Sequence, residues 1–475
     1  MKTKKNAIAN SFLYFFKYLI PLVTFPYLTR ILSKEKLGNV FFIDSIVQYL
    51  LIFTTAGVPL YAIRELSKLS KQLDERARFS AELIVIQVSI SVAALVVLLL
   101  SPYLFTSLWQ NIWLIRIGCI SVICSSFMLE WYFQATENYK YITYRTVFIK
   151  TIAAISILII VKNRDDDIKY YLLANLFLLL NAIVNFYFFY KNSPRIHLKK
   201  IQVTRHLKPL LIFFLLNLSV SIYTILDTVI LGFLTNSTSV SLYNVPLKIV
   251  KVSSGFILSI GFVLIPTMSR YYKLGQADKI ETMVSQMLNI TLLFGIPCCL
   301  FFLILSKEII TIAAGASYVE AHIILMLLAP LPLIISVCNA LGTQFLLPSS
   351  EEKKILYATG IGLLISVISN VILIQTYNYL GSAIAYLITE AFVCIYIYHH
   401  AKKRIKLSID KKLLLNIIFA VIITTLGYFT LKEYLSGPIF ICINAILYLA
   451  TFVSAHFLIF NSKYLNSVLN IKRAK

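Results

Sequence analysis

Charged side chains occur inside long apolar stretches of this sequence. There an ionised group costs about 2.5–3.5 kcal/mol to insert into a membrane and is a functional candidate for that reason. The basic residues so placed are Lys17, Arg116, Arg145, Lys150, Lys248 and Lys251. The acidic residues well inside such stretches are Asp44, Asp227 and Glu390. A cavity with excess lysine suits an anionic headgroup, because desolvated contacts between ammonium and phosphate groups are charge-assisted and strong. It would repel a cationic drug.

The expected depth of each charged residue in the membrane indicates whether its role is functional or structural. Arg145, Glu82 and Glu130 lie near the ends of their apolar stretches. We expect these three side chains to snorkel to the membrane surface. Lys17, Lys150 and Glu390 lie near the middle of theirs, where snorkelling is difficult, so a functional role is favoured over a purely structural ion pair.

A second set of charges is expected in the outer half of the membrane. Lys248 and Lys251 are three residues apart and share one helix face. Asp44 and Asp227 are expected at a similar depth. We therefore predict that Asp44 pairs with Lys248 or Lys251 and closes the outer side of a cleft.

The composition identifies the environment of these charges. The chain has 475 residues, of which 59% are apolar and only 14% charged. Soluble domains are roughly 45–50% apolar and about 25% charged. The net charge of +23 is typical of nucleic-acid-binding proteins, but this chain has too little polar surface for a soluble one. We conclude that it is a membrane protein that binds no nucleic acid.

Apolar runs long enough to cross a bilayer, about 20 residues each, determine the predicted topology. We interpret the first as a retained span rather than a signal peptide, because Lys17, Pro21 and Pro26 interrupt it. Fourteen spans are predicted, near 10–29, 39–63, 80–101, 110–133, 141–161, 170–190, 209–234, 243–269, 284–305, 322–346, 355–375, 381–400, 413–431 and 438–460.

The basic residues of the connecting segments orient these spans. With the N-terminus inside, 30 of the 44 Lys and Arg residues fall in inside segments and 8 in outside loops. The positive-inside rule therefore predicts that both termini are cytoplasmic. The basic segments also suit anionic lipid headgroups.

The loops exclude several functional classes. The longest, at about 191–208, is too short for an extramembrane catalytic or nucleotide-binding domain. The chain has no GxxxxGK[ST] phosphate loop, and its histidines and cysteines show no metal-ligand spacing. We expect no cofactor and no bound metal. The outside run 165–167 of three aspartates is expected to be a solvated loop.

An internal duplication is predicted from short similarities about 205 residues apart. Asn39-Val40 corresponds to Asn244-Val245, and Gly57-Val-Pro-Leu is similarly offset from Gly261-Phe-Val-Leu. An offset of six helices preserves orientation, so the repeat is parallel and its halves enclose a cleft. The predicted organisation is a six-helix bundle at 1–190, a cytoplasmic linker at 191–208, a second bundle at 209–400, and two further helices with a tail at 401–475.

Three motifs resemble those of bacterial polysaccharide repeat-unit flippases. They are Gly57-Val-Pro-Leu-Tyr-Ala-Ile-Arg-Glu-Leu-Ser67, Glu130-Trp-Tyr-Phe-Gln-Ala-Thr-Glu-Asn-Tyr-Lys-Tyr-Ile142 followed by Arg145, and Gly342-Thr-Gln-Phe-Leu-Leu-Pro348. The resemblance covers essentially the whole chain. One departure is Ala135, where this family commonly has glycine.

This resemblance implies the fold of the multidrug/oligosaccharidyl-lipid/polysaccharide exporter superfamily, in the bacterial inner membrane. It also implies a substrate, an O-antigen or capsule repeat unit linked to undecaprenyl pyrophosphate, and a polysaccharide polymerase as a candidate partner. The implied pyrophosphate contacts are Lys17, Lys248 and Lys251, with Arg116 and Lys150 completing the cationic cleft. The implied ion-coupling or gate residues are Asp44, Asp227 and Glu390.

Two other functions stay open from the residues alone. A cation-coupled drug or solute antiporter of the same superfamily would have a cleft dominated by carboxylates, which this sequence lacks. A membrane glycosyltransferase or polymerase would need catalytic acids in sizeable outside loops, yet three of those loops carry no charge. We therefore predict a transporter rather than an enzyme.

Overall fold

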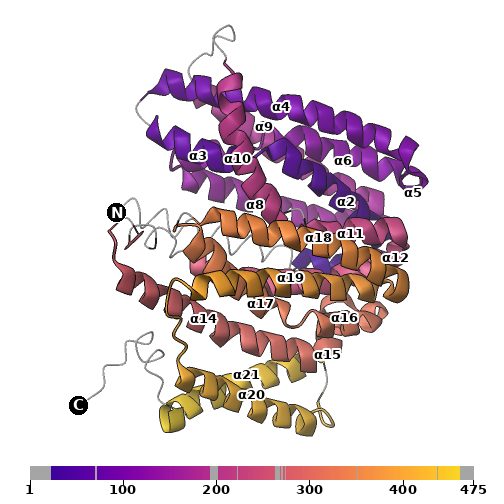
Figure 1. The fold of residues 1–475 in the computed structure, drawn as a ribbon. Coiled ribbons are helices and arrows are strands. Elements are labelled where there is room, and N and C mark those ends of the chain that lie inside the picture. Colours follow the sequence, from indigo (N-terminus) through magenta and orange to yellow (C-terminus); the bar gives the residue numbers. More distant parts are fainter. Residues whose placement is uncertain are drawn as a thin grey trace. The chain divides into compact units, whose positions relative to one another are not determined.

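The computed structural model describes residues 23–69, 72–192, 202–221, 223–262, 268, 271–272, 274–349, 351–435 and 437–460. Within these ranges every regular element is a helix (Figure 1). The predicted all-α membrane class is confirmed in this part of the chain.

The chain divides into two compact units, Met1–Ser241 and Leu242–Lys475. Unit 1 contains α2 (Lys34–Thr55), α3 (Val58–Lys68), α4 (Leu73–Leu104), α5 (Thr106–Trp109), α6 (Ile112–Ser125), α7 (Glu130–Ala135), α8 (Tyr139–Ile160), α9 (Asp167–Asn192), α10 (Thr204–Ser221) and α11 (Tyr223–Leu234). The helix α12 (Ser237–Phe262) crosses the boundary. Unit 2 continues with α14 (Ala277–Ile304), α15 (Ser306–Ala314), η2 (Ala316–Ala321), α16 (His322–Leu327), α17 (Leu331–Leu341), η3 (Gly342–Leu346), α18 (Glu352–Tyr377), α19 (Tyr379–Lys402), α20 (Lys411–Leu431), α21 (Gly437–Ala455) and η4 (His456–Phe460).

Eleven of the fourteen predicted spans correspond to helices of membrane length, if the bent pair described next is counted as one span. Ten helical segments of the described part are long and apolar enough to cross a membrane, or eleven if the bent pair Ala316–Leu327 and Leu331–Leu346 is one span. The spans expected at 10–29, 209–234 and 243–269 each include residues outside the described ranges. The count of fourteen, and the bundle boundaries given above, stay predictions.

The second predicted span is a broken helix. α2 ends at Thr55 and α3 begins at Val58. The two residues between them, Ala56 and Gly57, have left-handed backbones, with φ of 46° and 72°. Pro59 follows in the first turn of α3, where it needs no N–H partner. A side chain at Gly57 would also meet the backbone nitrogen of Phe214 at 2.5 Å, so glycine is required here for close packing with α10.

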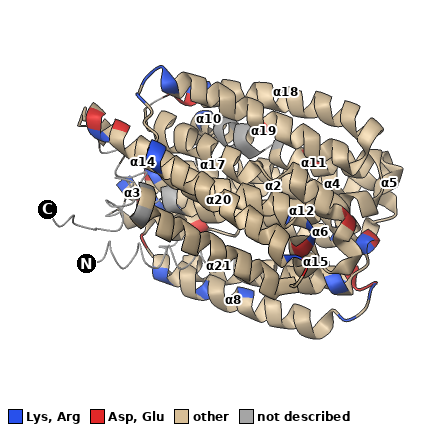
Figure 2. Ribbon diagram, turned by 90° about the horizontal axis from the view of Figure 1, so that it is seen from below, with Lys and Arg blue, Asp and Glu red and all other residues tan. Residues whose placement is uncertain are grey.

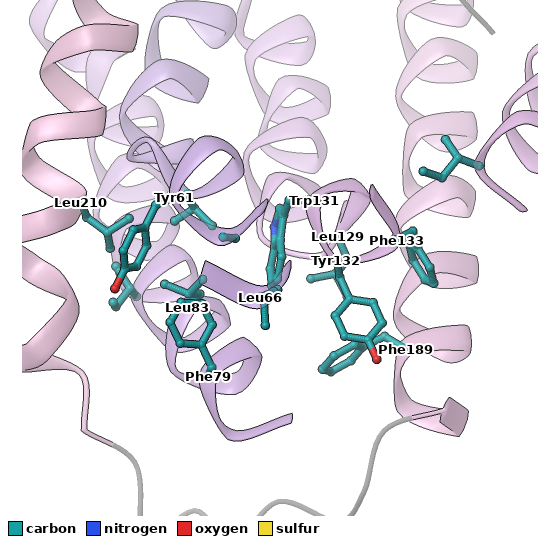
Figure 3. Close-up of a cluster of buried hydrophobic side chains, with 14 residues drawn as sticks. Tyr61, Leu66, Phe79, Leu83, Leu129, Trp131, Tyr132, Phe133, Phe189 and Leu210 are labelled. Carbon is teal, nitrogen blue, oxygen red and sulfur yellow. The ribbon is translucent and has the colours of Figure 1, made fainter. Parts of the chain in front are cut away.

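One hydrophobic cluster of unit 1 lies at one end of its helices. α3, α4 and α7 contribute most of it, with single residues from α8, α9 and α10. Figure 3 shows the labelled members, among them Trp131, Tyr132 and Phe133 of α7, which are at most 4% exposed. The motif that begins at Glu130 is thus a packing element as well as a family resemblance.

Unit 2 contains three hydrophobic clusters, one of which draws on helices in a similar order. It takes residues from α14, then from α17 and η3, then from α18 and α19. The cluster of unit 1 takes residues from α4, α7, α8 and α9, and in addition from α3 and α10. In both units the fourth span is irregular at this end: α6 breaks before α7, and α17 passes into the π-helical turn η3. This order agrees with the predicted duplication.

The charged residues are distributed in the way expected of a membrane protein, with few of them along the apolar helices. Lys and Arg lie mostly near helix ends, whereas α8 carries basic positions along its length (Figure 2). Exposed large apolar side chains run along the helices, as expected of surfaces that face lipid.

The hairpin of α18 and α19 gives a test of helix packing. A Cβ at Gly381 would overlap the backbone of Leu373, whereas one at Gly360 would meet nothing within 4 Å. We expect Gly381→Ala to lower the free energy of unfolding by about 1–3 kcal/mol, because the two backbones must move apart. Gly360→Ala is the matched control and should be neutral or stabilising by up to about 1 kcal/mol. Thermal unfolding in detergent measures both, and equal midpoints for the two variants would contradict this packing.

Candidate functional site

A fully buried carboxylate, Glu82 of α4, is the centre of an ion cluster in unit 1. Its side chain has 0% exposed surface. Arg78, one turn earlier on α4, donates its Nε–H at 3.1 Å. The backbone N–H of Gln202 donates at 2.8 Å, and Arg205 donates from Nε at 3.0 Å and from Nη2. The cluster therefore joins α4 to the segment that leads into α10, at the end of unit 1 predicted to be cytoplasmic.

His206 extends this cluster to α3. Its Nε2 lies 2.8 Å from the Glu82 carboxylate, and its Nδ1 lies 2.9 Å from the hydroxyl of Tyr61. Because an ionised carboxylate only accepts, Nε2 donates to Glu82. The hydroxyl of Tyr61 can donate or accept, so its contact with Nδ1 fits a neutral imidazole and an imidazolium alike. The Nε–H of Arg205 is also directed at Nε2, at 3.2 Å. His206 lies before the span expected at 209–234. Burial lowers the pKa of its imidazole, and the nearby Glu82 carboxylate opposes that shift.

Aromatic packing fixes the imidazole in place. The ring of Phe79 meets that of His206 edge-on, with centroids 4.8 Å apart. Tyr61 and Phe79 belong to the core shown in Figure 3, together with Leu83 and Leu210. The polar cluster is therefore positioned by this hydrophobic cluster of unit 1.

A second buried cluster surrounds Arg145 of α8. Its guanidinium donates to Glu130 at 3.0 Å, to Thr146 at 3.0 Å and to the side-chain oxygen of Asn185. Asn185 of α9 in turn donates to the backbone carbonyl of Met128. Met128 lies in the break between α6 and α7, so this cluster satisfies backbone that the break leaves without helical partners.

The prediction that these end-of-span charges snorkel is wrong for Glu82 and Arg145. The Arg145 side chain is 4% exposed, whereas that of Glu130 is 40% exposed. Glu82 is covered by the segment before α10, and Arg145 by α9 and α7. Both charges are satisfied by protein partners instead of by the membrane surface.

The prediction of a solvated loop at 165–167 is also wrong for two of its three aspartates. Asp166 is 5% and Asp167 4% exposed. Asp166 accepts the backbone N–H groups of Lys162 and Asn163 at 2.9 Å each, and pairs with Lys169 at 2.8 Å. These bonds to the ionised form lower the pKa of Asp166 well below its usual range.

This shift predicts a pH-dependent contribution to stability. A depressed carboxyl pKa stabilises the fold at pH values above the ordinary pKa, and the stabilisation is lost as pH falls through the folded-state value. We expect Asp166→Asn to lower the thermal midpoint by about 1–4 °C at pH 7, since the hydrogen bonds and the ion pair that close this loop are weakened. The difference should shrink as the pH is lowered from 4 towards 2. Asp165→Asn, at the exposed neighbour, is the control, and equal effects of the two variants would contradict this assignment.

The acidic residues predicted for ion coupling are all placed. Asp227 on α11 and Glu390 on α19 are buried, at 2% and 4% exposure. Asp44 on α2 is half-buried and accepts from Gln48 at 2.5 Å. The three acids lie on different helices, and each has interaction partners.

The predicted basic residues are placed with one exception. Lys17 lies outside the described residues. Lys150 on α8 and Lys248 on α12 are half-buried, whereas Lys251 is exposed. Arg116 is exposed on α6, with its guanidinium over the ring of Trp113 at 4.8 Å. The pairing of Asp44 with Lys248 or Lys251 joins residues of different units and stays a prediction, as do the roles of these residues.

The sequence interpretation did not identify the cluster of Glu82, Arg205 and His206 as a site. A local signal existed in Arg78 and Glu82, which are four residues apart at the start of an apolar run. The contact with His206 spans 124 residues and has no local signal. In the described part of the chain no group of three or more His, Cys, Asp or Glu side chains could hold a metal ion.

Apolar membrane-length helices, short loops and two similarly built units define a polytopic membrane protein of the duplicated-bundle class. Residues 3–272 match the family described as polysaccharide biosynthesis protein. The chain therefore belongs to that family, and the predicted resemblance to polysaccharide flippases is confirmed. It is 25% identical over 398 residues to a putative O-antigen transporter of Shigella dysenteriae, covering 83% of this chain and 98% of the relative.

Solved structures support the fold. A lipid II flippase, MurJ, in an inward closed conformation has a TM-score of 0.73 at 17% identity and covers 95% of this chain and 98% of its own. An inward-facing multidrug resistance MATE family transporter of the MOP superfamily has a TM-score of 0.62 at 14% identity, covering 83% and 94%. At these identities the likeness shows the fold alone, which is the predicted superfamily fold. The relatives are named as transporters and flippases, in agreement with the prediction that this chain is not an enzyme.

Proposed function

We propose that this protein flips a lipid-linked oligosaccharide across the bacterial inner membrane. The substrate is an O-antigen or capsule repeat unit on undecaprenyl pyrophosphate, moved from the cytoplasmic to the periplasmic leaflet. The observation that carries the proposal is similarity along nearly the whole length of a putative O-antigen transporter, within a polysaccharide biosynthesis family. The fold shared with a lipid II flippase is in keeping with it.

The chemistry of the membrane-embedded charges supports a pyrophosphate substrate. Lys17, Lys248 and Lys251 are the proposed headgroup contacts, with Arg116 and Lys150 adding positive charge. Ammonium and guanidinium groups in a desolvated path favour phosphate strongly. Lys150 and Lys248 are half-buried, as residues of such a path should be.

Alternating access and coupling to an ion gradient complete the proposal. Asp44, Asp227 and Glu390 are the proposed ion-coupling or gate residues. Burial of Asp227 and Glu390 within apolar helices supports this role, because intramembrane carboxylates are costly and suited to reversible ion binding.

Translocation in proteoliposomes tests the function directly. The purified protein is reconstituted into vesicles with a fluorescent undecaprenyl-pyrophosphate oligosaccharide. The fraction of the fluorescence that an added quencher can reach is measured over time, with and without an ion gradient. We expect protein-dependent movement between leaflets, faster with a gradient. A control lipid that carries the same glycan on phosphatidylethanolamine should not move. Equal rates with and without protein would contradict the proposal.

A further inference from the structure

The chain passes from unit 1 to unit 2 once, and it does so inside a helix. The division falls between Ser241 and Leu242, after the first five residues of α12. The helices α10 and α11, which occupy the seventh predicted span, therefore lie in unit 1, although the predicted duplication places that span in the second bundle. The position where the predicted repeats join and the position where the two units join are thus different.

The inner end of the seventh span is held in unit 1 by buried groups. Glu82 on α4, whose side chain is 0% exposed, accepts the backbone N–H of Gln202 at 2.8 Å and the Nε–H of Arg205 at 3.0 Å. Leu210 belongs to the hydrophobic cluster of α3, α4 and α7. Gly57 lies so close to α10 that a side chain there would meet its backbone. Separation of α10 from unit 1 would leave buried charge without its partners, which is costly.

The outer end of the same span is held by close contacts with α2. A Cβ at Gly232 on α11 would overlap the ring of Phe42. A Cβ at Gly38 would overlap the carbonyl group of Ser237, the first residue of α12. The hydroxyl of Ser237 also donates to the side-chain oxygen of Asn39. Small residues at such positions let helix backbones approach closely.

Attachment at both ends fixes the seventh span and the first turn of α12 to unit 1. A span that the same body holds at its inner and outer ends cannot tilt away from that body at one end alone. The chain offers one connection between the units, and its seven cysteines are free. Any change in the angle between the units must therefore be taken up further along α12.

Pro246 lies inside α12 just beyond this boundary. Because proline has no N–H, the carbonyl of Leu242 receives no helical hydrogen bond from position 246, and the proline ring crowds that carbonyl. Sharp bends in helices occur at such prolines. In the predicted duplication, which pairs Asn39 with Asn244, the residue of α2 that corresponds to Pro246 is Phe41, and α2 has no proline. A proline is thus not needed to build a span of this kind.

We propose that the turn Leu242–Pro246 is the hinge about which the two units move, and that the seventh span moves with unit 1. Lys248 and Lys251 follow this turn on the same helix, so bending at the hinge changes their position relative to unit 1. The role of these lysines rests on the proposed function. The hinge itself rests on the contacts of unit 1 and on the place of Pro246.

Distances between spin labels in liposomes test the hinge without any substrate. The labels are introduced as non-natural amino acids at three exposed positions, Lys140, Leu207 and Lys403. The pair 140–207 lies within unit 1, and the pair 140–403 joins the two units. We expect a single narrow distance for the first pair, and for the second a broad distribution that Pro246→Ala narrows. A 140–207 distribution as broad as that of 140–403, or a 140–403 distribution that Pro246→Ala leaves unchanged, would overturn the proposal.

Translocation in proteoliposomes gives a second measurement, which depends on the proposed function. Pro246→Ala restores the missing hydrogen bond, and this bond must then break whenever α12 bends. One hydrogen bond of about 1 kcal/mol corresponds to a rate lowered about fivefold. Pro297→Ala, at the interior proline of α14 within unit 2, is the matched control and should transport at the wild-type rate. An equal loss in the two variants would contradict the hinge. Wild-type protein that moves no lipid-linked glycan would contradict the proposed function, and the spin-label distances would still decide on the hinge.

A crosslink at the outer contact distinguishes this hinge from a gate between α2 and α12. Cysteines replace both partners of the hydrogen bond, as Asn39→Cys and Ser237→Cys, and a short thiol-specific reagent joins them. Because both positions belong to unit 1, we expect the joined protein to keep its transport rate and its broad 140–403 distribution. Loss of both on crosslinking would show that α12 parts from α2 at Ser237 and would overturn the proposal.

Discussion

Replacing Glu82 by alanine is expected to lower the free energy of unfolding by about 2–4 kcal/mol. Removing one partner of a buried ion pair typically costs about 3–5 kcal/mol, because the remaining charge stays buried without compensation. Here the two arginines can recover some hydration, since the side chains of Arg78 and Arg205 are 34% and 45% exposed. The Nε2–H of His206 and the N–H of Gln202 lose their acceptor entirely, which adds to the cost.

Glu65→Ala is the matched control for this prediction. Glu65 also engages two basic side chains, Arg64 and Lys68, but these are 59% and 61% exposed. Exposed ion pairs contribute about 0–1 kcal/mol, so this variant should unfold close to the wild-type midpoint. Thermal or denaturant unfolding in detergent compares the two. Equal stabilities of the Glu82 and Glu65 variants would show that the buried cluster does not hold unit 1 together.

The architecture was predictable because the bilayer imposes it on the sequence. Runs of about 20 apolar residues have few alternatives to a spanning helix. The predicted span near 80–101 is α4, and that near 381–400 is α19, with ends that differ by up to seven residues. The helix breaks at Ala56 and between α6 and α7 could not be predicted from hydropathy, because they depend on packing against other helices.

The charged clusters show where local inference fails. Glu82 and Arg145 lie near the ends of predicted spans. Hydropathy alone therefore predicts that their charges reach water at the membrane surface. Their actual partners, among them His206 and Asn185, are 124 and 40 residues away in the chain. The three aspartates at 165–167 are identical in type, yet Asp166 closes its own loop through partners within four residues, whereas Asp167 lies 3.9 Å from the distant Lys36. Hydrophobic periodicity encodes neither kind of partner.

The largest expected effect on transport is that of Lys17→Ala combined with Lys248→Ala. Hydrogen bonds to a charged group contribute about 1.5–3 kcal/mol each, and every 1.4 kcal/mol is a factor of ten. If both ammonium groups contact the pyrophosphate, the double variant should translocate undecaprenyl-pyrophosphate glycan at least about tenfold more slowly in proteoliposomes. Lys162→Ala, at an exposed lysine of the 162–166 loop, is the control and should transport normally.

Two further comparisons separate charge from shape. Arginine at both positions retains the positive charge and should preserve much of the transport that alanine removes. A substrate with the same glycan on a monophosphate presents less negative charge, so the alanine variants should slow it less than the pyrophosphate substrate. Unchanged transport of the pyrophosphate substrate by the double alanine variant would remove Lys17 and Lys248 from the headgroup site. The flippase proposal would survive that result, since it depends on movement of the lipid-linked glycan and not on which cations accompany it.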